Sequence, residues 1–497
     1  MTLGKCGIAA VATLATFGIS APSAPADVET ITIDATATGR PFPHFWERMF
    51  GSGRAVLSLR ADYRDDLRSV KQITGFEYIR FHAVLDHDMG VYSEDAHGNP
   101  VYNFSYVDQS YDGLLANGVK PFVELSFMPK ELAANPALHP FWYKPYPSPP
   151  NDPAKWSALV EAFTRHLVER YGRPEVESWY FEVWNEPNID FWDGAPKQST
   201  YLAFYDITAR AVKKVDPLLR VGGPATAQAA WIPEFIAHCT EKHVPFDFVS
   251  THVYGNDTSM DVFGRQMPIA RKDMVAMAAK KVHDQVKASA APATPVIWSE
   301  YNATYMNQTE VTDSAFMGPW LANNIRESDG MSEMMSYWCF SDVFEEQGVV
   351  KTPFYGGYGL IAEREIPKPA FRAFELLHRL GHQRLDSDLE DALVTKTGDG
   401  SIVVALWNYA EPGEDGAPKT FRLDVRGTEA KEYTMQWVSP DRASSRKAFL
   451  EMGSPASPSL AQIHKLIEAS RFPAAEAHAL DDPITLSPRT LAIIEIK

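Results

Sequence analysis

Short apolar runs alternate with amphipathic stretches from about residue 45 to residue 380. Eight of the runs are nearly continuous in apolar residues, which is typical of parallel strands buried on both faces. The stretches between them repeat apolar residues at helical spacing, and one opens with Asp152 and Pro153, an N-cap and a first-turn proline. The predicted strands are Glu47–Gly51, Phe76–Ala83, Val119–Phe127, Val176–Glu186, Arg220–Pro224, Phe246–Tyr254, Thr294–Asn302 and Met334–Asp342.

Eight strands that alternate with helices predict an α/β fold, a (β/α)₈ TIM barrel over residues 42–382. The rival is an open doubly wound sheet, but no G-x-G-x-x-G motif follows the first strand. From residue 383 to residue 497 the apolar runs are short and separated by Gly, Pro and Asp, which predicts a smaller β-sandwich. Residues 27–41 alternate in the same way and are expected to add a strand to that sandwich.

The first 26 residues have the pattern of an export signal. Lys5 supplies one positive charge, Gly7–Ile19 is a short apolar stretch, and Ala24–Ala26 offers a cleavage site. We therefore expect a protein that is exported to the periplasm or the medium after residues 1–26 are removed. Beyond this segment no apolar run reaches the 18 or so residues that a membrane helix needs, so no membrane span is expected.

Two cysteines lie outside the predicted signal, Cys239 in a helical pattern and Cys339 in a strand pattern. Two thiols this far apart do not indicate a disulfide framework, so both are predicted to be buried and free. Neither has metal-ligating neighbours at the spacing of a zinc finger, so no metal site is expected.

Acidic residues outnumber lysine and arginine by 64 to 47, and the net charge is −17 at pH 7. Nucleic acids and anionic membranes need a basic surface, so neither is an expected partner. The charge favours a neutral or cationic small ligand instead. Aromatic residues make up 12% of the chain, and four tryptophans lie at or near the predicted catalytic face of the barrel: Trp142, Trp184, Trp298 and Trp338.

Barrel enzymes place their chemistry at the carboxyl ends of the strands, so acidic residues there are candidate catalysts. Glu186 ends the fourth predicted strand, and Glu300 lies near the end of the seventh, each after an apolar run that contains tryptophan. A carboxylate in such a place is costly to desolvate, so its pKa should rise or a partner must compensate its charge. Two glutamates that face each other suit glycoside hydrolysis, in which one protonates the leaving oxygen and the other attacks the anomeric carbon.

The alternative for any single strand-end glutamate is a structural ion pair with an arginine. We expect that role for Glu182, which lies deeper in the predicted barrel and is paired with Arg80 of the second strand. Glu186 and Glu300 occur together in the same context at the functional face, which favours catalysis for both.

The chain resembles glycoside hydrolase family 39, the family of β-xylosidases and α-L-iduronidases, over about residues 42–377. Several separate motifs occur in the order of that family, including the loop after the third strand. The family carries a β-sandwich after its barrel, with a contribution from the N-terminus. The matching stretches are Phe141–Lys144, Phe181–Asn188, Thr251–Gly255, Trp298–Asn302, Ser336–Glu346 and Tyr355–Leu360.

The resemblance implies a role for each residue at a matching position. Glu186 would be the general acid/base and Glu300 the nucleophile of a retaining mechanism, with carboxyl groups about 5–5.5 Å apart. Asn185 would bond the sugar 2-hydroxyl group, and Tyr254 could also hold the Glu300 carboxylate. The positions expected to bind substrate are His82, Asn185, His252, Tyr254, Trp338, Glu345 and Glu346.

The acidic loop after the eighth strand bears on the sugar. Asp342, Glu345 and Glu346 would repel the carboxylate of an iduronide or glucuronide, which needs an arginine or lysine partner. A neutral pentoside fits better, and β-D-xyloside is the commonest substrate of the family. The resemblance therefore implies an exo-acting β-xylosidase that hydrolyses xylo-oligosaccharides or β-xylosides through a covalent glycosyl-enzyme intermediate.

Other functions remain open on the sequence. One is a retaining glycosidase of the same family acting on a β-glucoside, β-galactoside, α-L-arabinoside or α-L-iduronide, and another is an endo-acting enzyme with a long groove. A non-catalytic carbohydrate-binding protein would have lost one carboxylate motif, and both are intact here. No cofactor is implied, because protonation and covalent attack by carboxylates suffice. The sequence leaves the oligomeric state undetermined.

Overall fold

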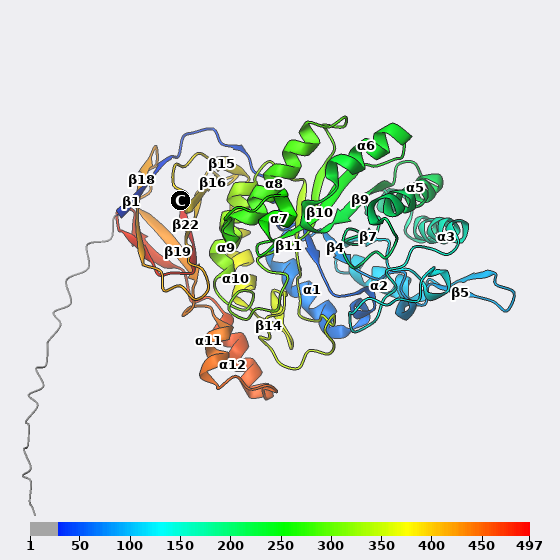
Figure 1. Ribbon diagram of the computed structural model, residues 1–497. Helices are drawn as coiled ribbons and strands as arrows, with labels where there is room; N and C mark the ends of the chain where they lie inside the picture. Colours follow the sequence, from blue (N-terminus) through cyan, green and yellow to red (C-terminus); the bar gives the residue numbers. More distant parts are fainter. Residues whose placement is uncertain (1–27) are drawn as a thin grey trace, which may run out of the picture.

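The computed structural model describes residues 28–497, and its larger part is a closed barrel of eight parallel strands (Figure 1), as predicted. The strands, in order around the barrel, are β3 (Met49–Gly51), β4 (Tyr78–Phe81), β7 (Lys120–Glu124), β8 (Tyr180–Glu182), β9 (Arg220–Thr226), β10 (Phe248–Tyr254), β11 (Val296–Asn302) and β12 (Met334–Tyr337). The main helices that follow them are α1 (Ala61–Ile73), α2 (Ser105–Leu115), α3 (Pro153–Tyr171), α5 (Lys197–Val215), α6 (Ile232–Lys242), α8 (Arg271–Lys287), α9 (Met317–Ser328) and α10 (Pro369–Leu377).

Most of the predicted barrel strands are too long, because apolar residues continue into the loops at both strand ends. The clearest case is Val176–Glu186, in which Val176 ends a short helix, α4 (Arg173–Val176), and only three residues form strand β8. Helix α3 begins as predicted, and the Asp152 carboxylate accepts a hydrogen bond from the backbone N–H of Ala154 at 2.8 Å.

The barrel interior is divided into an apolar layer and a charged layer. One apolar residue from each of seven strands packs into a plug at the amino end. Strand β9 has Gly222 at this level, where a Cβ atom would lie 2.5 Å from the carbonyl oxygen of Phe248. Charged side chains therefore gather at the carboxyl end of the barrel, above the plug. The plug consists of Met49, Tyr78, Phe122, Tyr180, Phe248, Ile297 and Met334.

Two sheets form the second unit, and strands from before the barrel belong to both. The three-stranded sheet has the order β1 (Val28–Asp34), β18 (Lys419–Arg426) and β21 (Ile484–Leu486). The seven-stranded sheet has the order β2 (Arg40–Pro41), β15 (Gln383–Leu385), β16 (Ala392–Lys396), β17 (Ile402–Asn408), β22 (Thr490–Ile496), β19 (Glu432–Val438) and β20 (Glu476–Ala479). Figure 1 shows this unit beside α9 and α10 of the barrel.

The seven-stranded sheet is buried on both faces, as strand β17 illustrates. Val404 and Leu406 face the three-stranded sheet and share a core with Ile31 of β1. Val403 and Trp407 face the other way and belong to the core of the barrel. Since successive side chains of a strand point to opposite faces, this double burial explains the unbroken apolar run of β17.

The C-terminal unit also contains two helices that were not predicted, α11 (Ser445–Glu451) and α12 (Leu460–Ser470). They pack together below the sandwich and contact β14 (Ile366–Pro367), which pairs with β13 (Ile361–Ala362). A hairpin of β5 (Tyr92–Glu94) and β6 (Pro100–Tyr102) projects from the barrel, and α7 (Ser259–Phe263) follows β10.

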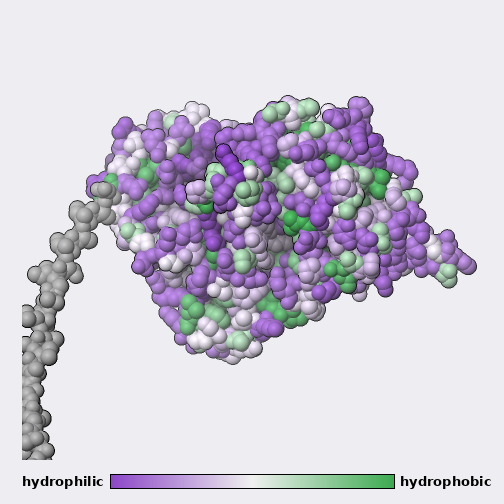
Figure 2. Space-filling model, viewed as in Figure 1, coloured by the Kyte–Doolittle hydropathy of each residue, from purple (hydrophilic) through white to green (hydrophobic). Residues whose placement is uncertain are grey.

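Other expectations concern the surface, the cysteines and the ends. The face in Figure 2 is largely hydrophilic, with apolar residues in small separate patches. None of the helices within residues 28–497 is both long and apolar enough to cross a bilayer. Cys239 and Cys339 are buried and free, which confirms that prediction. The predicted export signal, residues 1–26, lies outside the described residues.

Candidate active site

A cavity of about 390 Å³ opens at the carboxyl end of the barrel, above the charged layer. Both predicted catalytic glutamates face it, together with residues from the loops after most strands. The lining residues are His82, Phe141, Asn185, Glu186, Ile189, Phe191, Ala227, Gln228, Tyr254, Asp257, Glu300, Tyr305, Trp338, Glu346, Gln347 and Tyr358.

Glu186 reaches the cavity through a contorted segment that follows β8. Trp184 and Glu186 both have positive φ angles, 74° and 45°, which cost energy in residues other than glycine. The Trp184 indole N–H donates to the carbonyl oxygen of Phe191 at 2.7 Å, and the Glu186 N–H donates to that of Ala225 at 2.8 Å. These bonds hold the Glu186 side chain over the mouth of the barrel.

Glu300 lies within strand β11, opposite Glu186. The Tyr254 hydroxyl donates to its Oε2 atom at 2.6 Å, as expected, and the Arg80 guanidinium contacts its Oε1 atom at 2.7 Å. A carboxylate oxygen of Glu186 and one of Glu300 lie within 4.8 Å of each other. Carboxylates this near to each other agree with the separation of about 5–5.5 Å in retaining glycosidases and are nearer than the roughly 6.5–9.5 Å of inverting ones.

Arg80 joins three buried carboxylates at the floor of the site. Its Nε atom lies 2.6 Å from Glu182, which confirms the predicted pair. Its two terminal nitrogens contact Glu124 and Glu300, each at 2.7 Å. Burial raises the pKa of Glu182, whereas Arg80 and His82 lower the pKa of Glu124 despite its burial. One guanidinium therefore holds all three carboxylates in position.

Arg80 also fixes the orientation of the Asn185 amide. The Asn185 Oδ1 atom accepts a hydrogen bond from Arg80 Nη2 at 2.9 Å. A guanidinium only donates, so the oxygen of the amide must face Arg80 and its NH₂ group must face the cavity. Asn185 can therefore donate a hydrogen bond to a bound hydroxyl group.

The environment of Glu186 favours its protonated form. Burial and the negative charge of Glu300 raise the pKa of Glu186 well above that of an exposed glutamate. His252 lies beneath it, with Nδ1 at 2.9 Å from Glu186 Oε1 and Nε2 at 3.1 Å from Ser299 Oγ. Burial and the charge of Arg80 lower the pKa of His252 well below its usual value, so the imidazole is neutral.

Trp338 forms one wall of the cavity because strand β3 has a glycine beneath it. A Cβ atom at Gly51 would lie 2.1 Å from the Trp338 ring. His82 packs against the same ring at 4.8 Å between centroids, and its Nδ1 atom lies 2.8 Å from the Glu124 carboxylate. Burial would lower the pKa of His82, but Glu124 raises it, so this imidazole favours its charged form.

Two of the predicted substrate-binding residues do not line the cavity. Glu345 is bound by Arg60 at 2.9 Å and Arg54 at 3.3 Å, so its carboxylate is turned away from the site. His252 is completely buried beneath Glu186 and can act only through its neighbours. Glu346 does face the cavity, with its carboxylate 3.8 Å from His82, and burial raises its pKa to about 8.

Most of the negative charge expected of the loop after the eighth barrel strand is therefore neutralised by bound lysine and arginine side chains. Asp342 is fully buried and its Oδ2 atom lies 2.6 Å from Lys368 Nζ, which also binds Asp313 at 2.7 Å. Together with the pairing of Glu345, this leaves Glu346 as the acid of that loop that faces the cavity. The expected repulsion of an anionic sugar could come from this loop only through Glu346, and the raised pKa of Glu346 leaves its carboxyl group largely uncharged at neutral pH.

The tryptophans are also distributed differently from the expectation. Trp184 and Trp298 are completely buried behind the site, so Trp338 is the one of the four that faces the cavity. Trp142 is 52% exposed, and the Arg54 guanidinium lies 5.7 Å from its ring. The backbone N–H of Trp142 donates to the carbonyl oxygen of Glu346 at 2.8 Å and so ties the third loop to the eighth.

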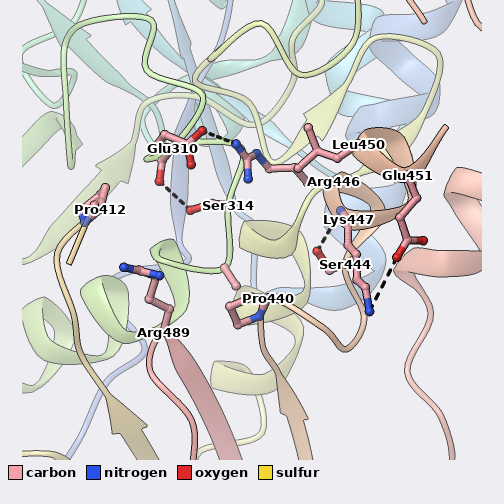
Figure 3. A pocket seen from close by; sticks show the side chains of 12 residues that line it. Glu310, Ser314, Pro412, Pro440, Ser444, Arg446, Lys447, Leu450, Glu451 and Arg489 are labelled. Carbon is pink, nitrogen blue, oxygen red and sulfur yellow. Dashed lines mark hydrogen bonds and ion pairs between the residues drawn. The ribbon is translucent and has the colours of Figure 1, made fainter. Parts of the chain in front are cut away.

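A second cavity, of about 270 Å³, lies where α11 meets the barrel and the sandwich (Figure 3). Its charged side chains are turned toward one another: Arg446 binds Glu310 at 2.6 Å, and Lys447 contacts Glu451 at 3.8 Å. The cavity has no pair of facing acids and no aromatic wall among its described lining residues. We therefore assign the functional site to the barrel mouth.

Comparison with known proteins agrees with this geometry. The model of the family described as glycosyl hydrolases family 39 matches residues 29–482. The chain belongs to this family.

Relatives of family 39 resemble the chain over nearly its full length. A β-xylosidase of Geobacillus stearothermophilus is 36% identical over 482 residues, covering 94% of this chain and 95% of the relative. A β-xylosidase of Caldicellulosiruptor saccharolyticus is 37% identical over 440 residues, covering 86% and 88%. The crystal structure of a monomeric β-xylosidase from Caulobacter crescentus superposes with a TM-score of 0.85 at 32% identity, covering 95% of this chain and 99% of that one.

Two groups of side chains in this family 39 hydrolase have the composition of metal ligands. In the first group, a hydrogen bond of 2.9 Å joins Glu186 and His252. In the second, Glu47 forms hydrogen bonds of 2.8 Å with His44 and with His378. Hydrogen bonding accounts for these short distances.

Sequence reasoning missed several residues of the site. Glu124 ends strand β7 and pairs in register with Glu182 of β8, so its place at a strand end could have revealed it. Asp257, Gln228 and Tyr305 lie in loops without a regular pattern, and nothing in the local sequence indicates that they face the cavity.

Proposed function

We propose that this family 39 hydrolase is a retaining β-xylosidase that releases terminal β-D-xylosyl residues, with Glu186 as acid/base and Glu300 as nucleophile. The observation that carries the proposal is the facing carboxylate pair, with oxygens within 4.8 Å, in which burial and Glu300 raise the pKa of Glu186. One carboxyl group is thereby suited to give a proton while the other is suited to attack.

The reaction has two displacements. In the first, Glu300 attacks the anomeric carbon, the bond to the leaving oxygen breaks, and the proton of Glu186 passes to that oxygen. In the second, Glu186 takes a proton from water, which attacks the same carbon and frees the Glu300 carboxylate. Tyr254 and Arg80 orient the nucleophile through the contacts described above, and the Asn185 amide can donate to the 2-hydroxyl group.

The walls of the cavity favour a neutral sugar. Within the described chain, no lysine or arginine lines this cavity, and Arg80 is fully buried beneath it, bound to three carboxylates. A uronic acid would therefore find no free guanidinium for its carboxylate. This supports a xyloside over an α-L-iduronide, and the relatives described as β-xylosidases support the same choice.

A panel of p-nitrophenyl glycosides tests the proposal. We expect the β-D-xyloside to have a higher kcat/KM than the β-glucoside, β-galactoside and α-L-arabinoside. Glu300→Ala should lower kcat by orders of magnitude while the far-ultraviolet circular dichroism spectrum shows that the fold is intact. Faster turnover of another sugar would reassign the substrate, and wild-type activity in Glu300→Ala would refute the mechanism.

A further inference from the structure

Asp257 is a buried acid on the cavity wall that the proposed mechanism does not use. It lies in the loop between β10 and α7 and is only 9% exposed. The Tyr254 N–H donates to its Oδ2 atom at 2.8 Å, and the Asp257 N–H donates back to the Tyr254 carbonyl oxygen at 3.0 Å. These two bonds fix the carboxylate against the cavity, which it lines.

The charge of Asp257 has no cationic partner. Within residues 28–497, no lysine, arginine or histidine nitrogen lies within 4 Å of its carboxylate, whereas the neighbouring Glu300 contacts Arg80 at 2.7 Å. The Gln228 side chain lowers the pKa of Asp257, but burial outweighs this effect and raises the pKa to about 7. A buried acid with so few partners, facing an open cavity, is available to bond a ligand.

Asp257 lies on the Glu186 side of the cavity. The segments that carry Glu186, Gln228 and Asp257 follow β8, β9 and β10, which are adjacent strands of the barrel, and the charge of Asp257 contributes to the raised pKa of Glu186. Gln228 comes from the loop after β9, and this loop is tied to the Glu186 segment by two bonds between Asn188 and Ala227, at 2.9 and 3.1 Å. Asp257, Gln228 and Glu186 thus form one wall.

The position of this wall defines what it can touch. Glu300 must face the anomeric carbon, and Glu186 must reach the oxygen that leaves it, so the leaving group lies on the Glu186 side. Resting on the proposed function, we propose that Asp257, assisted by Gln228, binds a hydroxyl group of the leaving sugar. The enzyme would then select xylosides whose leaving group is itself a sugar over those whose leaving group has no hydroxyl group.

Two substrates separate this role from an effect on the acid. Xylobiose and benzyl β-D-xyloside both have alkoxide leaving groups that need protonation by Glu186, but only xylobiose presents hydroxyl groups beyond the broken bond. For Asp257→Asn we expect kcat/KM on xylobiose to fall roughly tenfold or more, as for the loss of a hydrogen bond to a charged group. On benzyl β-D-xyloside we expect less than about a threefold change, because its leaving group makes no such bond.

Asp261, in the helix α7 that follows this loop, supplies the control, because its carboxylate accepts a hydrogen bond from the Thr258 hydroxyl at 2.5 Å and does not line the cavity. Asp261→Asn should leave both substrates unchanged. Gln228→Ala retains the Asp257 carboxylate and should reduce xylobiose turnover in the same direction but by a smaller factor. This second variant keeps the test sharp if Asp257→Asn unfolds at a lower temperature.

Equal losses on both substrates would overturn the proposal, since Asp257 would then act only through Glu186 or the fold. Unchanged turnover of xylobiose in Asp257→Asn would overturn it as well. Failure of the underlying function would look different, because the wild-type enzyme itself would then hydrolyse neither xyloside.

Discussion

Removing Arg80 should destabilise the barrel far more than removing an ordinary buried side chain. The guanidinium is completely buried and contacts Glu124, Glu182 and Glu300 at 2.6–2.7 Å. In Arg80→Met these acids lose a shared positive charge in a place that water does not reach. Breaking a buried ion pair by removing one partner costs about 3–5 kcal/mol, and three affected acids place this variant at the upper end.

A second substitution tests whether unpaired negative charge is the cause. Glu182→Gln removes one of the three charges while keeping the shape of the side chain. The double variant Arg80→Met/Glu182→Gln should therefore be more stable than Arg80→Met by about 1–3 kcal/mol, although each single change destabilises.

Urea unfolding followed by tryptophan fluorescence measures these free energies. Arg220→Met is the matched control, because Arg220 stacks on the Tyr180 ring at 3.6 Å and hydrogen-bonds the backbone carbonyl of Trp179 at 3.1 Å. Its loss leaves no carboxylate unpaired and should cost clearly less. An Arg80→Met enzyme within about 1 kcal/mol of wild type, or a double variant less stable than Arg80→Met, would refute this reasoning.

Three further predictions concern activity and pH. Glu186→Ala should lower kcat/KM on xylobiose by about 10²–10⁴-fold. It should also remove the fall in rate that the wild-type enzyme shows at high pH, where Glu186 loses its proton at its raised pKa, and a pH–rate profile that still falls in the same way would contradict this. Tyr254→Phe loses the 2.6 Å bond to Glu300 and should lower kcat by about 10–100-fold with little change in the unfolding midpoint; unaltered kcat would show that the bond does not matter. The hydrogen bond to Glu47 raises the pKa of His378, so this pair stabilises the fold fully below the usual histidine pKa and loses that effect as the pH rises through the raised pKa. The unfolding midpoints of wild type and His378→Gln should therefore come closer together as the pH rises over that range. A difference that grows with pH would contradict the prediction.

The carboxylate pair could be found from the sequence because its signal is local. Glu186 and Glu300 each follow an apolar run, and a parallel barrel brings its strand ends to one face, so two strand-end acids become neighbours once the strands are counted. The same argument paired Glu182 with Arg80. The sharing of Arg80 by three acids depends on the direction of each side chain inside the closed barrel, which strand counting does not supply.

The roles of the loop residues, by contrast, could not be predicted from the sequence. Glu345 and Glu346 are adjacent and chemically alike, yet one is bound by Arg54 and Arg60 while the other faces the cavity. Asp257 gives no periodic signal at all, and its carboxylate is positioned by a backbone turn.

The sequence by itself thus determined the barrel, the sandwich and the acids at the strand ends, because apolar periodicity and capping residues act over a few neighbours. Only the tertiary structure decided which charges are neutralised and which face substrate. The partner of a buried charge comes from another strand or loop: Lys368 lies 26 residues from Asp342, and Arg54 lies 291 residues from Glu345. Such pairings form only when the barrel closes, and they fix the charge of the cavity.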